Sequence, residues 1–78
     1  MNSNNEFNYE IKKQIAVLSE KNGYTVELNL ISYRGASPKL DLRKWNRNND
    51  TMQKGITLTT DEATALKDAL ERYLNEVG

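Results

Sequence analysis

The alternation of apolar and polar side chains within Tyr24–Tyr33 is the feature that most constrains how this chain folds. Val26, Leu28 and Leu30 occupy every second position of that stretch. A two-residue period places such side chains on one face of a β-strand. The Asn-Gly pair just before the stretch is the strongest short-range signal for a β-hairpin. The chain is therefore predicted to contain a strand that pairs with an earlier one through a tight turn.

Three other segments are also predicted to be strands. Tyr9–Leu18 has apolar residues at most of its odd positions, although nothing in this segment excludes a helix. Lys39–Trp45 resumes the alternation, with Leu40 and Leu42 on one face. After a polar, asparagine-rich loop, Lys54–Thr59 supplies a short last strand.

The C-terminal segment is predicted to be a helix. Thr59 and Glu62 have the spacing of a capping box, in which each side chain accepts a hydrogen bond from the other residue's backbone N–H. Apolar residues then recur at three- and four-residue spacing over residues 63–77. The fold class is therefore α+β with the order ββββα, and the helix is expected to cover the apolar face of the sheet. That face would carry Leu28, Leu30, Leu40, Leu42, Ile56 and Leu58.

Only one domain fits in 78 residues, and we expect it to occupy residues 9–78 after a flexible, asparagine-rich arm at residues 1–8. A chain this short has a small core, so oligomerisation is expected to add stability. No apolar run approaches the roughly 20 residues that a membrane span needs. The N-terminus also lacks the basic and apolar regions of a signal peptide. We therefore expect a cytoplasmic protein that makes no contact with a membrane.

The residue types argue against catalysis. The sequence contains no histidine and no cysteine, which excludes nucleophile–base pairs built on either residue. Its glycines stand alone, so there is no glycine-rich phosphate loop, and no spacing of carboxylates suggests a metal site. We expect no enzymatic activity, no metal, no cofactor and no small-molecule substrate.

Charge is distributed unevenly although the formal net charge is zero. Residues 34–54 contain two acidic residues and six basic ones, which are Arg34, Lys39, Arg43, Lys44, Arg47 and Lys54. The local balance of +4 leaves −4 to the rest of the chain, and much of the acid lies in the last 18 residues. This segregation predicts a basic face and an acidic face on one small domain.

The face opposite the predicted helix is expected to stay open and to carry Tyr33, Asp41, Arg43 and Trp45. Single-stranded nucleic-acid binding needs cations that follow the phosphates and flat rings on which bases stack. These residues provide both, but each also has an ordinary structural interpretation. Trp45 would suit a core or a dimer interface, and Arg43 would suit an ion pair with Asp41. A protein-interaction module that docks through its acidic helix or its open sheet is the alternative hypothesis.

The motifs KLDLRKW and KGITLTTDEATALKDAL resemble the C-terminal domain of the positive-cofactor-four (PC4-like) family of transcriptional coactivators, and more closely its short bacterial YdbC-type branch. The resemblance covers about residues 9–75. It implies a curved four-stranded antiparallel sheet with a C-terminal helix, and a homodimer. It also implies that single-stranded DNA binds in basic, aromatic-lined channels with little sequence preference, with RNA as an open alternative, in transcription regulation or DNA maintenance. The nucleic-acid-binding residues that it implies are Tyr33, Arg34, Lys39, Arg43, Trp45 and Lys54.

Overall fold

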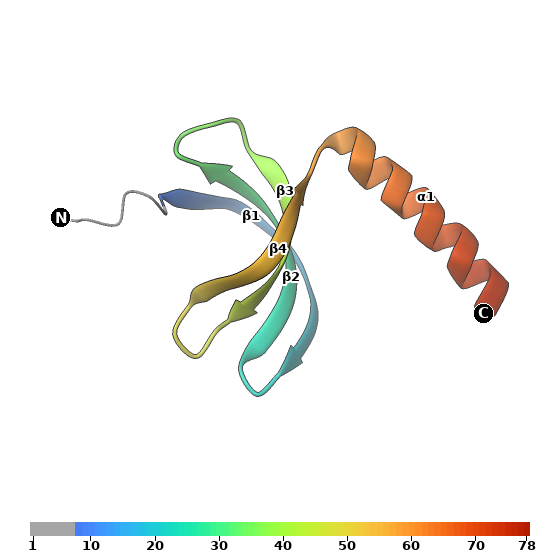
Figure 1. Ribbon diagram of the computed structural model, residues 1–78, viewed down its shortest axis with the longest axis horizontal. Helices are drawn as coiled ribbons and strands as arrows, with labels where there is room; N and C mark the ends of the chain where they lie inside the picture. The colour runs from blue at the N-terminus through green and yellow to red at the C-terminus, as the bar shows by residue number, and fades with distance from the viewer. Residues whose placement is uncertain (1–7) are drawn as a thin grey trace.

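The computed structural model describes residues 8–78, which form a four-stranded antiparallel sheet followed by one helix (Figure 1). The elements are β1 (Tyr9–Lys21), β2 (Tyr24–Tyr33), β3 (Lys39–Asn46), β4 (Thr51–Leu58) and α1 (Thr60–Val77). The strands lie in chain order, so each one pairs with its neighbours in the sequence. The predicted ββββα order is confirmed. The arm expected at residues 1–8 lies outside the described residues apart from Asn8, whose carbonyl oxygen accepts a hydrogen bond from the Arg34 N–H at 2.9 Å.

The predicted hairpin turn between β1 and β2 is confirmed. Asn22 and Gly23 have φ values of 55° and 85°. Positive φ at both central residues is the requirement of a type I′ turn, which matches the twist of the flanking strands. The Arg47 N–H donates to the carbonyl oxygen of Gly23 at 2.7 Å. This bond holds the start of the β3–β4 loop against the β1–β2 turn.

Strand β4 begins three residues earlier than the sequence pattern predicts. Trp45 pairs with Met52, and Arg43 pairs with Gly55, so β4 contains an additional residue between these two pairs. The polar residues after β3 suggested a longer loop. The residues at the start of β4 nevertheless pair with β3, because a bulge accommodates the additional residue. This pairing between strands outweighs the local preference of polar residues for a loop.

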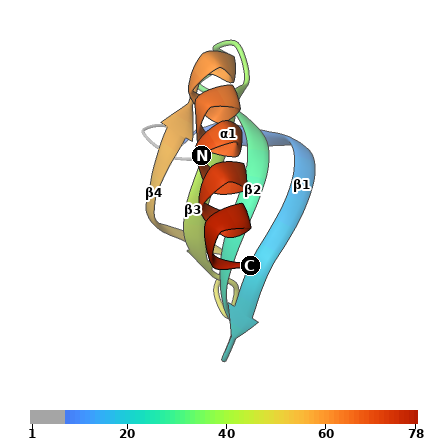
Figure 2. The ribbon, with the colours of Figure 1, turned by 90° about the vertical axis from the view of Figure 1, so that its right-hand side faces the viewer.

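Strand β1 contains three irregularities of register, in the segments 11–13, 14–16 and 17–19. The strand predicted here is confirmed, but its two-residue period is not, because each bulge moves the following side chains to a different face. Bulges also bend a strand and increase its twist. The sheet is accordingly strongly curved, with a concave and a convex side (Figures 1 and 2).

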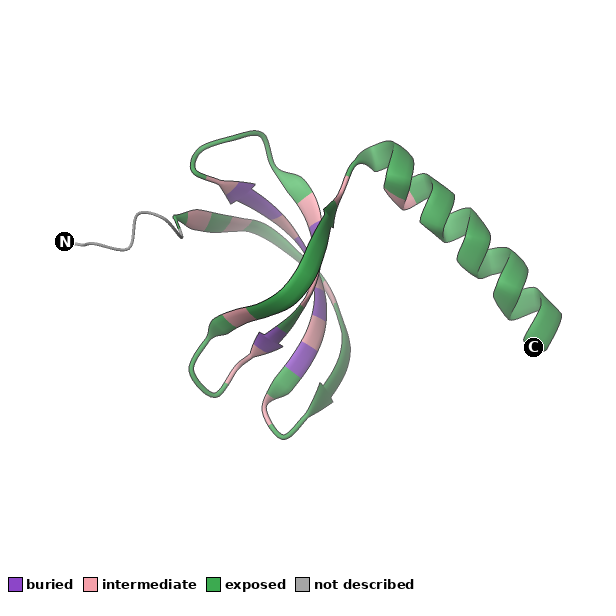
Figure 3. Cartoon of the chain, viewed as in Figure 1, coloured by how far each residue is buried: buried purple, intermediate pink, exposed green. Residues whose placement is uncertain are grey.

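The concave face is the buried one. Thr25, Trp45 and Met52 are paired across three neighbouring strands and therefore share this face. The side chains with at most 7% exposure on β2 and β3 include Thr25, Glu27, Asn29, Ile31, Asp41 and Trp45 (Figure 3). On the convex face the leucines are only partly buried, and Ile56 is 56% exposed. The expectation that the apolar face forms the core of the chain and that the other face stays open is therefore wrong.

Helix α1 does not cover the sheet. Its predicted capping box is confirmed, because the Glu62 N–H donates to Thr59 Oγ1 at 3.0 Å and the Thr59 N–H donates to Glu62 Oε1 at 2.9 Å. No residue of α1 is buried, and the helix packs lightly, chiefly against β4. Figures 1 and 2 show it running on the convex side while diverging from the sheet toward its C-terminus. Only Thr59 separates β4 from α1, so the helix starts directly at the end of the edge strand.

The described part of the chain contains no helix that is both long enough and apolar enough to cross a bilayer.

Gly55 allows β3 and β4 to approach each other closely. A Cβ atom at this position would lie 2.4 Å from the Arg43 Cβ and 2.7 Å from the Leu42 carbonyl oxygen. Gly55→Ala is therefore expected to lower the free energy of unfolding by about 1–3 kcal/mol, as overpacking does elsewhere. Urea unfolding at a fixed protein concentration measures this. Thr57→Ala on the same strand, at an exposed position, is the control, and equal stability of the two variants would contradict the predicted clash.

Candidate nucleic-acid interface

Tyr33, Asp41 and Arg43 form a connected cluster on the concave face. Arg43 donates from Nε and Nη2 to the two carboxylate oxygens of Asp41, at 2.9 and 2.7 Å. The Tyr33 hydroxyl donates to Asp41 Oδ2 at 2.6 Å and accepts from Arg43 Nη2 at 3.2 Å. Burial raises the pKa of Tyr33 to about 12, and its hydrogen bond to the Asp41 carboxylate adds to this rise. The phenol is therefore a neutral donor at any physiological pH.

Arg43 links three strands. Besides its bonds to Asp41, it donates from Nη1 to the carbonyl oxygen of Gln53 on β4 at 3.0 Å. The hydrogen bond to Asp41, whose side chain is 0% exposed, raises the pKa of Arg43. Arg43 was predicted to contact nucleic acid, and that stays a prediction. Its guanidinium is largely occupied by partners within the protein.

Glu27 and Arg47 form a second ion pair on the same face. Arg47 donates from Nε and Nη2 to the two oxygens of Glu27, at 2.8 and 2.6 Å. Thr25 Oγ1 donates to Glu27 at 2.6 Å, and Asn29 Nδ2 donates at 3.2 Å. The hydrogen bond from Arg47 is the largest of the effects that lower the pKa of Glu27 to about 2, against the opposing effect of burial.

Trp45 lies between Tyr9 and Arg47. The Tyr9 ring meets it edge-on at a centroid distance of 6.0 Å, and Arg47 Cζ lies 4.0 Å from the centroid of its ring. The indole is 0% exposed, and its Nε1–H donates to no acceptor within residues 8–78. The expectation that Trp45 presents an open ring is therefore wrong, because sheet curvature brings these neighbours over it. Its contact with nucleic acid stays a prediction.

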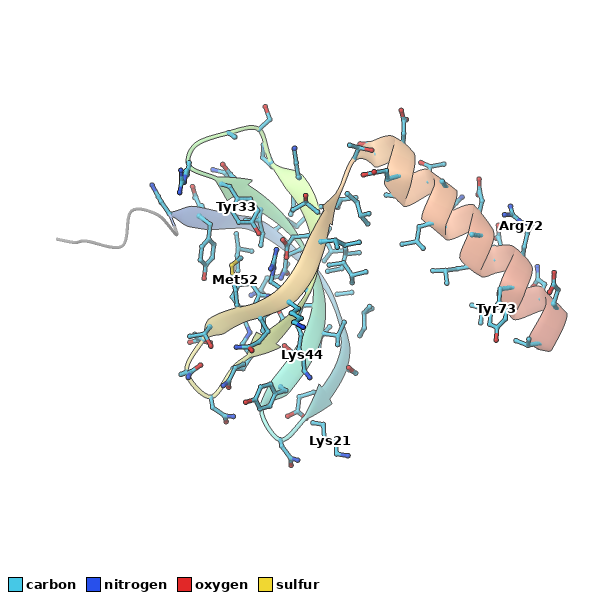
Figure 4. All side chains as sticks on the ribbon, viewed as in Figure 1. Lys21, Tyr33, Lys44, Met52, Arg72 and Tyr73 are labelled. Atoms are coloured by element: carbon cyan, nitrogen blue, oxygen red, sulfur yellow. The ribbon has the colours of Figure 1, made fainter. Side chains whose placement is uncertain are left out.

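The other three predicted residues are exposed. Arg34 follows Tyr33 in the β2–β3 turn and has a φ of 53°. Lys39 begins β3 and shares the concave face with Asp41, because both have odd numbers on one strand. Lys54 lies in the bulged part of β4, beside Gly55. The fold thus brings four of the six predicted residues to the concave face, which are Tyr33, Lys39, Arg43 and Trp45. Figure 4 shows Tyr33 on that side of the sheet with Met52.

Comparison with known proteins identifies the family. The family model for Transcriptional Coactivator p15 (PC4) matches residues 20–69, which is more than half of the chain. The chain belongs to the PC4 family. An uncharacterized protein of Treponema pallidum (strain Nichols) is 41% identical over 68 residues, which cover 86% of this chain and 80% of that protein. The match confirms the resemblance to the PC4 family that the sequence motifs indicated. Its range includes all six predicted residues, and their contacts with nucleic acid stay predictions.

Two residues of this candidate interface, Arg47 and Tyr9, were missed by sequence reasoning. Arg47 was counted only as a charge in a loop, although it lies two positions after Trp45, where strand alternation would place it on the same face. Tyr9 has no such local signal, because it pairs with Tyr33, at the other end of β2 from Thr25, the partner of Trp45. It reaches Trp45 only because the sheet is curved, and it lies outside the matched range. Within residues 8–78, no three histidine, cysteine or carboxylate side chains gather in a way that could hold a metal ion.

Glu27 is expected to make stability depend on pH. Its pKa falls from an ordinary 4.5 to about 2 in the folded protein, so its contribution is fully present above pH 4.5 and is lost as pH falls toward 2. Glu27→Gln is expected to cost about 2–3 kcal/mol at pH 6, and this difference from the wild type should shrink at low pH.

Urea unfolding of both proteins between about pH 6 and pH 2.5 measures this difference. Glu71→Gln makes the same chemical change at an exposed position of α1 and serves as the control. A difference between Glu27→Gln and the wild type that stays constant down to the lowest pH would contradict the ion-pair assignment.

Proposed function

We propose that this protein is a homodimer that binds single-stranded DNA with little sequence preference, and that it acts in the cytoplasm in transcription regulation or DNA maintenance. The match to a family of transcriptional coactivators over residues 20–69 is the observation that carries this proposal. The family is DNA-binding and has no enzymatic activity. The shared concave face of four of the six predicted residues further supports it.

Phosphate binding is assigned to two exposed lysines. Lys39 and Lys54 are exposed, and within residues 8–78 neither forms an ion pair with a carboxylate. The arginines of the face, by contrast, are paired with Asp41 and Glu27. Uncompensated cations are the groups that release counterions when they meet phosphates. The lysines therefore supply the electrostatic part of binding.

Weak sequence preference follows from the hydrogen bonding of the concave face. Reading a base requires donors or acceptors that are free to meet its edge. Here the two carboxylates accept from the arginines and from neighbouring polar side chains. Side chains whose hydrogen-bonding groups are already paired with one another can offer a base a flat contact surface, but few base-specific hydrogen bonds.

Dimerisation is supported by the apolar surface that one chain leaves exposed. The large apolar residues of α1 with 37–62% exposure are Leu66, Leu70, Tyr73, Leu74 and Val77. In Figure 4, Tyr73 points to the side of α1 that faces the sheet, and Arg72 points to the opposite side. Tyr73 of this stripe is therefore on the side of α1 that faces the convex side of the sheet. Burying this surface against a second copy would be favourable by about 25 cal/mol per Å².

A protein-interaction module remains the alternative function, and the same apolar stripe with its acidic neighbours favours it. A foreign partner and a second copy of the chain would compete for this surface. The mass of the purified protein distinguishes the two, because only the homodimer needs no second component.

Titration with an oligo-dT of about 20 nucleotides tests DNA binding. We expect binding tighter than to the matching duplex, and a loss of affinity as salt is raised from about 50 to 300 mM. Lys39→Ala and Lys54→Ala should each reduce the slope of log affinity against log salt by about 0.7, the value for one phosphate on a single strand.

Arg72→Ala on α1 is the matched control for these lysine variants and should leave the slope unchanged. Duplex binding of equal strength, or an affinity that salt does not alter, would refute the DNA-binding proposal. Tighter binding to an oligo-U of the same length would identify RNA as the natural partner.

Light scattering on the purified protein tests the dimer. The expected mass is twice the 9.0 kDa of one chain. Tyr73→Asp and Leu70→Asp place a charge in the exposed apolar stripe and should shift the protein to the monomer mass, because an unpaired charge is costly to bury. Arg72→Asp, on the opposite side of the helix, should leave the dimer intact. A wild-type protein of monomer mass at high concentration would contradict dimerisation and favour the alternative.

A further inference from the structure

The guanidinium group of Arg47 provides a flat surface on the concave face. Its Cζ atom lies 4.0 Å from the centroid of the Trp45 ring, so the indole covers one side of the group. The Arg47 side chain nevertheless keeps 27% of its surface exposed. Guanidinium planes stack with nucleobases in the same way as aromatic rings do. The side of Arg47 turned away from Trp45 is therefore a surface on which a base can stack.

Three of the five in-plane N–H donors of Arg47 are used within the protein. Nε and Nη2 donate to Glu27 at 2.8 and 2.6 Å, and Nη1 donates to Asp50 at 3.3 Å. These bonds neutralise the positive charge and hold the plane in one orientation. The electrostatic gain of a phosphate contact comes from uncompensated charge, whereas Arg47 is already paired with Glu27 and Asp50. Its flat side is what it can offer to a ligand.

A hollow of about 400 Å³ adjoins this group. Residues 14–17 of β1 line one part of it, and Glu27, Asn29 and Arg47 line another. Ile15 and Val17 in that β1 segment are 42% and 61% exposed, so apolar surface borders the same space as the charged plane. A nucleobase suits this environment, because its faces are apolar and polarisable while its edges tolerate water.

We propose that Arg47, backed by Trp45, is a nucleobase-stacking site, and that Glu27 is the positioning residue that fixes its plane. This inference rests on the proposed binding of single-stranded DNA and adds Arg47 and Glu27 to the six residues named above. Glu27 accepts hydrogen bonds from Thr25, from Asn29 and twice from Arg47. Its four acceptor positions are thus filled, so the site holds a base of any identity.

The test combines a variant with a change in the ligand. Arg47→Lys keeps the positive charge but removes the flat group. An oligonucleotide of equal length in which every nucleotide is an abasic site keeps the phosphates but removes the bases that would stack. We expect Arg47→Lys to weaken binding of the oligo-dT at least about fivefold with an unchanged salt slope. The same variant should bind the abasic strand as the wild type does.

Arg72→Lys makes the same substitution on α1 and should match the wild type with both ligands. Equal binding of the oligo-dT by Arg47→Lys and the wild type would overturn the proposal. A loss of the same factor with both ligands would also overturn it, because it would show a structural or phosphate-binding role. If the wild-type protein fails to bind the oligo-dT at all, the proposed function itself fails, and the site fails with it.

A measurement on the wild-type protein avoids any effect of the variant on folding. The Arg47 Nε–H, held by Glu27 at 2.8 Å, gives an NMR signal that reports on the surface of the guanidinium. A base stacked on the group should shift this signal through its ring current when the oligo-dT is added. The abasic strand should leave the signal in place. The same shift with both strands, or no shift with either, would rule out stacking at Arg47.

Discussion

The curvature of the sheet is the constraint on which the rest of this structure depends. Three bulges in β1 and one in the β3–β4 pair bend the four strands around a concave side. Curvature crowds the side chains of the inner face and spreads those of the outer face. A single layer can therefore bury its own concave side without a covering helix. This geometry explains why Asp41 and Trp45 are fully buried in one chain while Ile56 and most of the helix remain exposed.

A buried polar face is stable only if its groups satisfy one another. Asp41 and Glu27 each meet an arginine through two hydrogen bonds, so the two ion pairs carry no net charge between them. Residues 34–54 have an excess of basic residues in the sequence, but on the concave face the arginines of this segment are neutralised by carboxylates. Uncompensated charge is left to exposed lysines such as Lys39. The face offers flat groups to bases, and the exposed lysines offer cations to phosphates.

The same curvature leaves the chain with apolar surface that it cannot bury alone. In a flat sheet the helix would pack on the leucines and complete a two-layer domain. Here α1 diverges from the sheet, and its apolar stripe and the convex face remain apart (Figures 1 and 2). A chain of 78 residues has little other core. In the proposed dimer, the second chain would cover this apolar surface. Sheet curvature would then account both for dimerisation and for the shape of the concave face.

The sequence by itself determined the elements: the alternation in β2 and β3, the Asn22-Gly23 turn and the capping box at Thr59 are local signals with local causes. It also indicated the family, because the motifs after Lys39 are contiguous in the chain. Only the tertiary structure decided which sheet face is buried. Alternation separates two faces but does not say which way the sheet bends, and the bulges that bend it are set by pairing between strands. The contact of Tyr9 with Trp45 follows from that bend and could not be read from spacing, whereas the two-residue spacing of Arg47 from Trp45 was a usable signal.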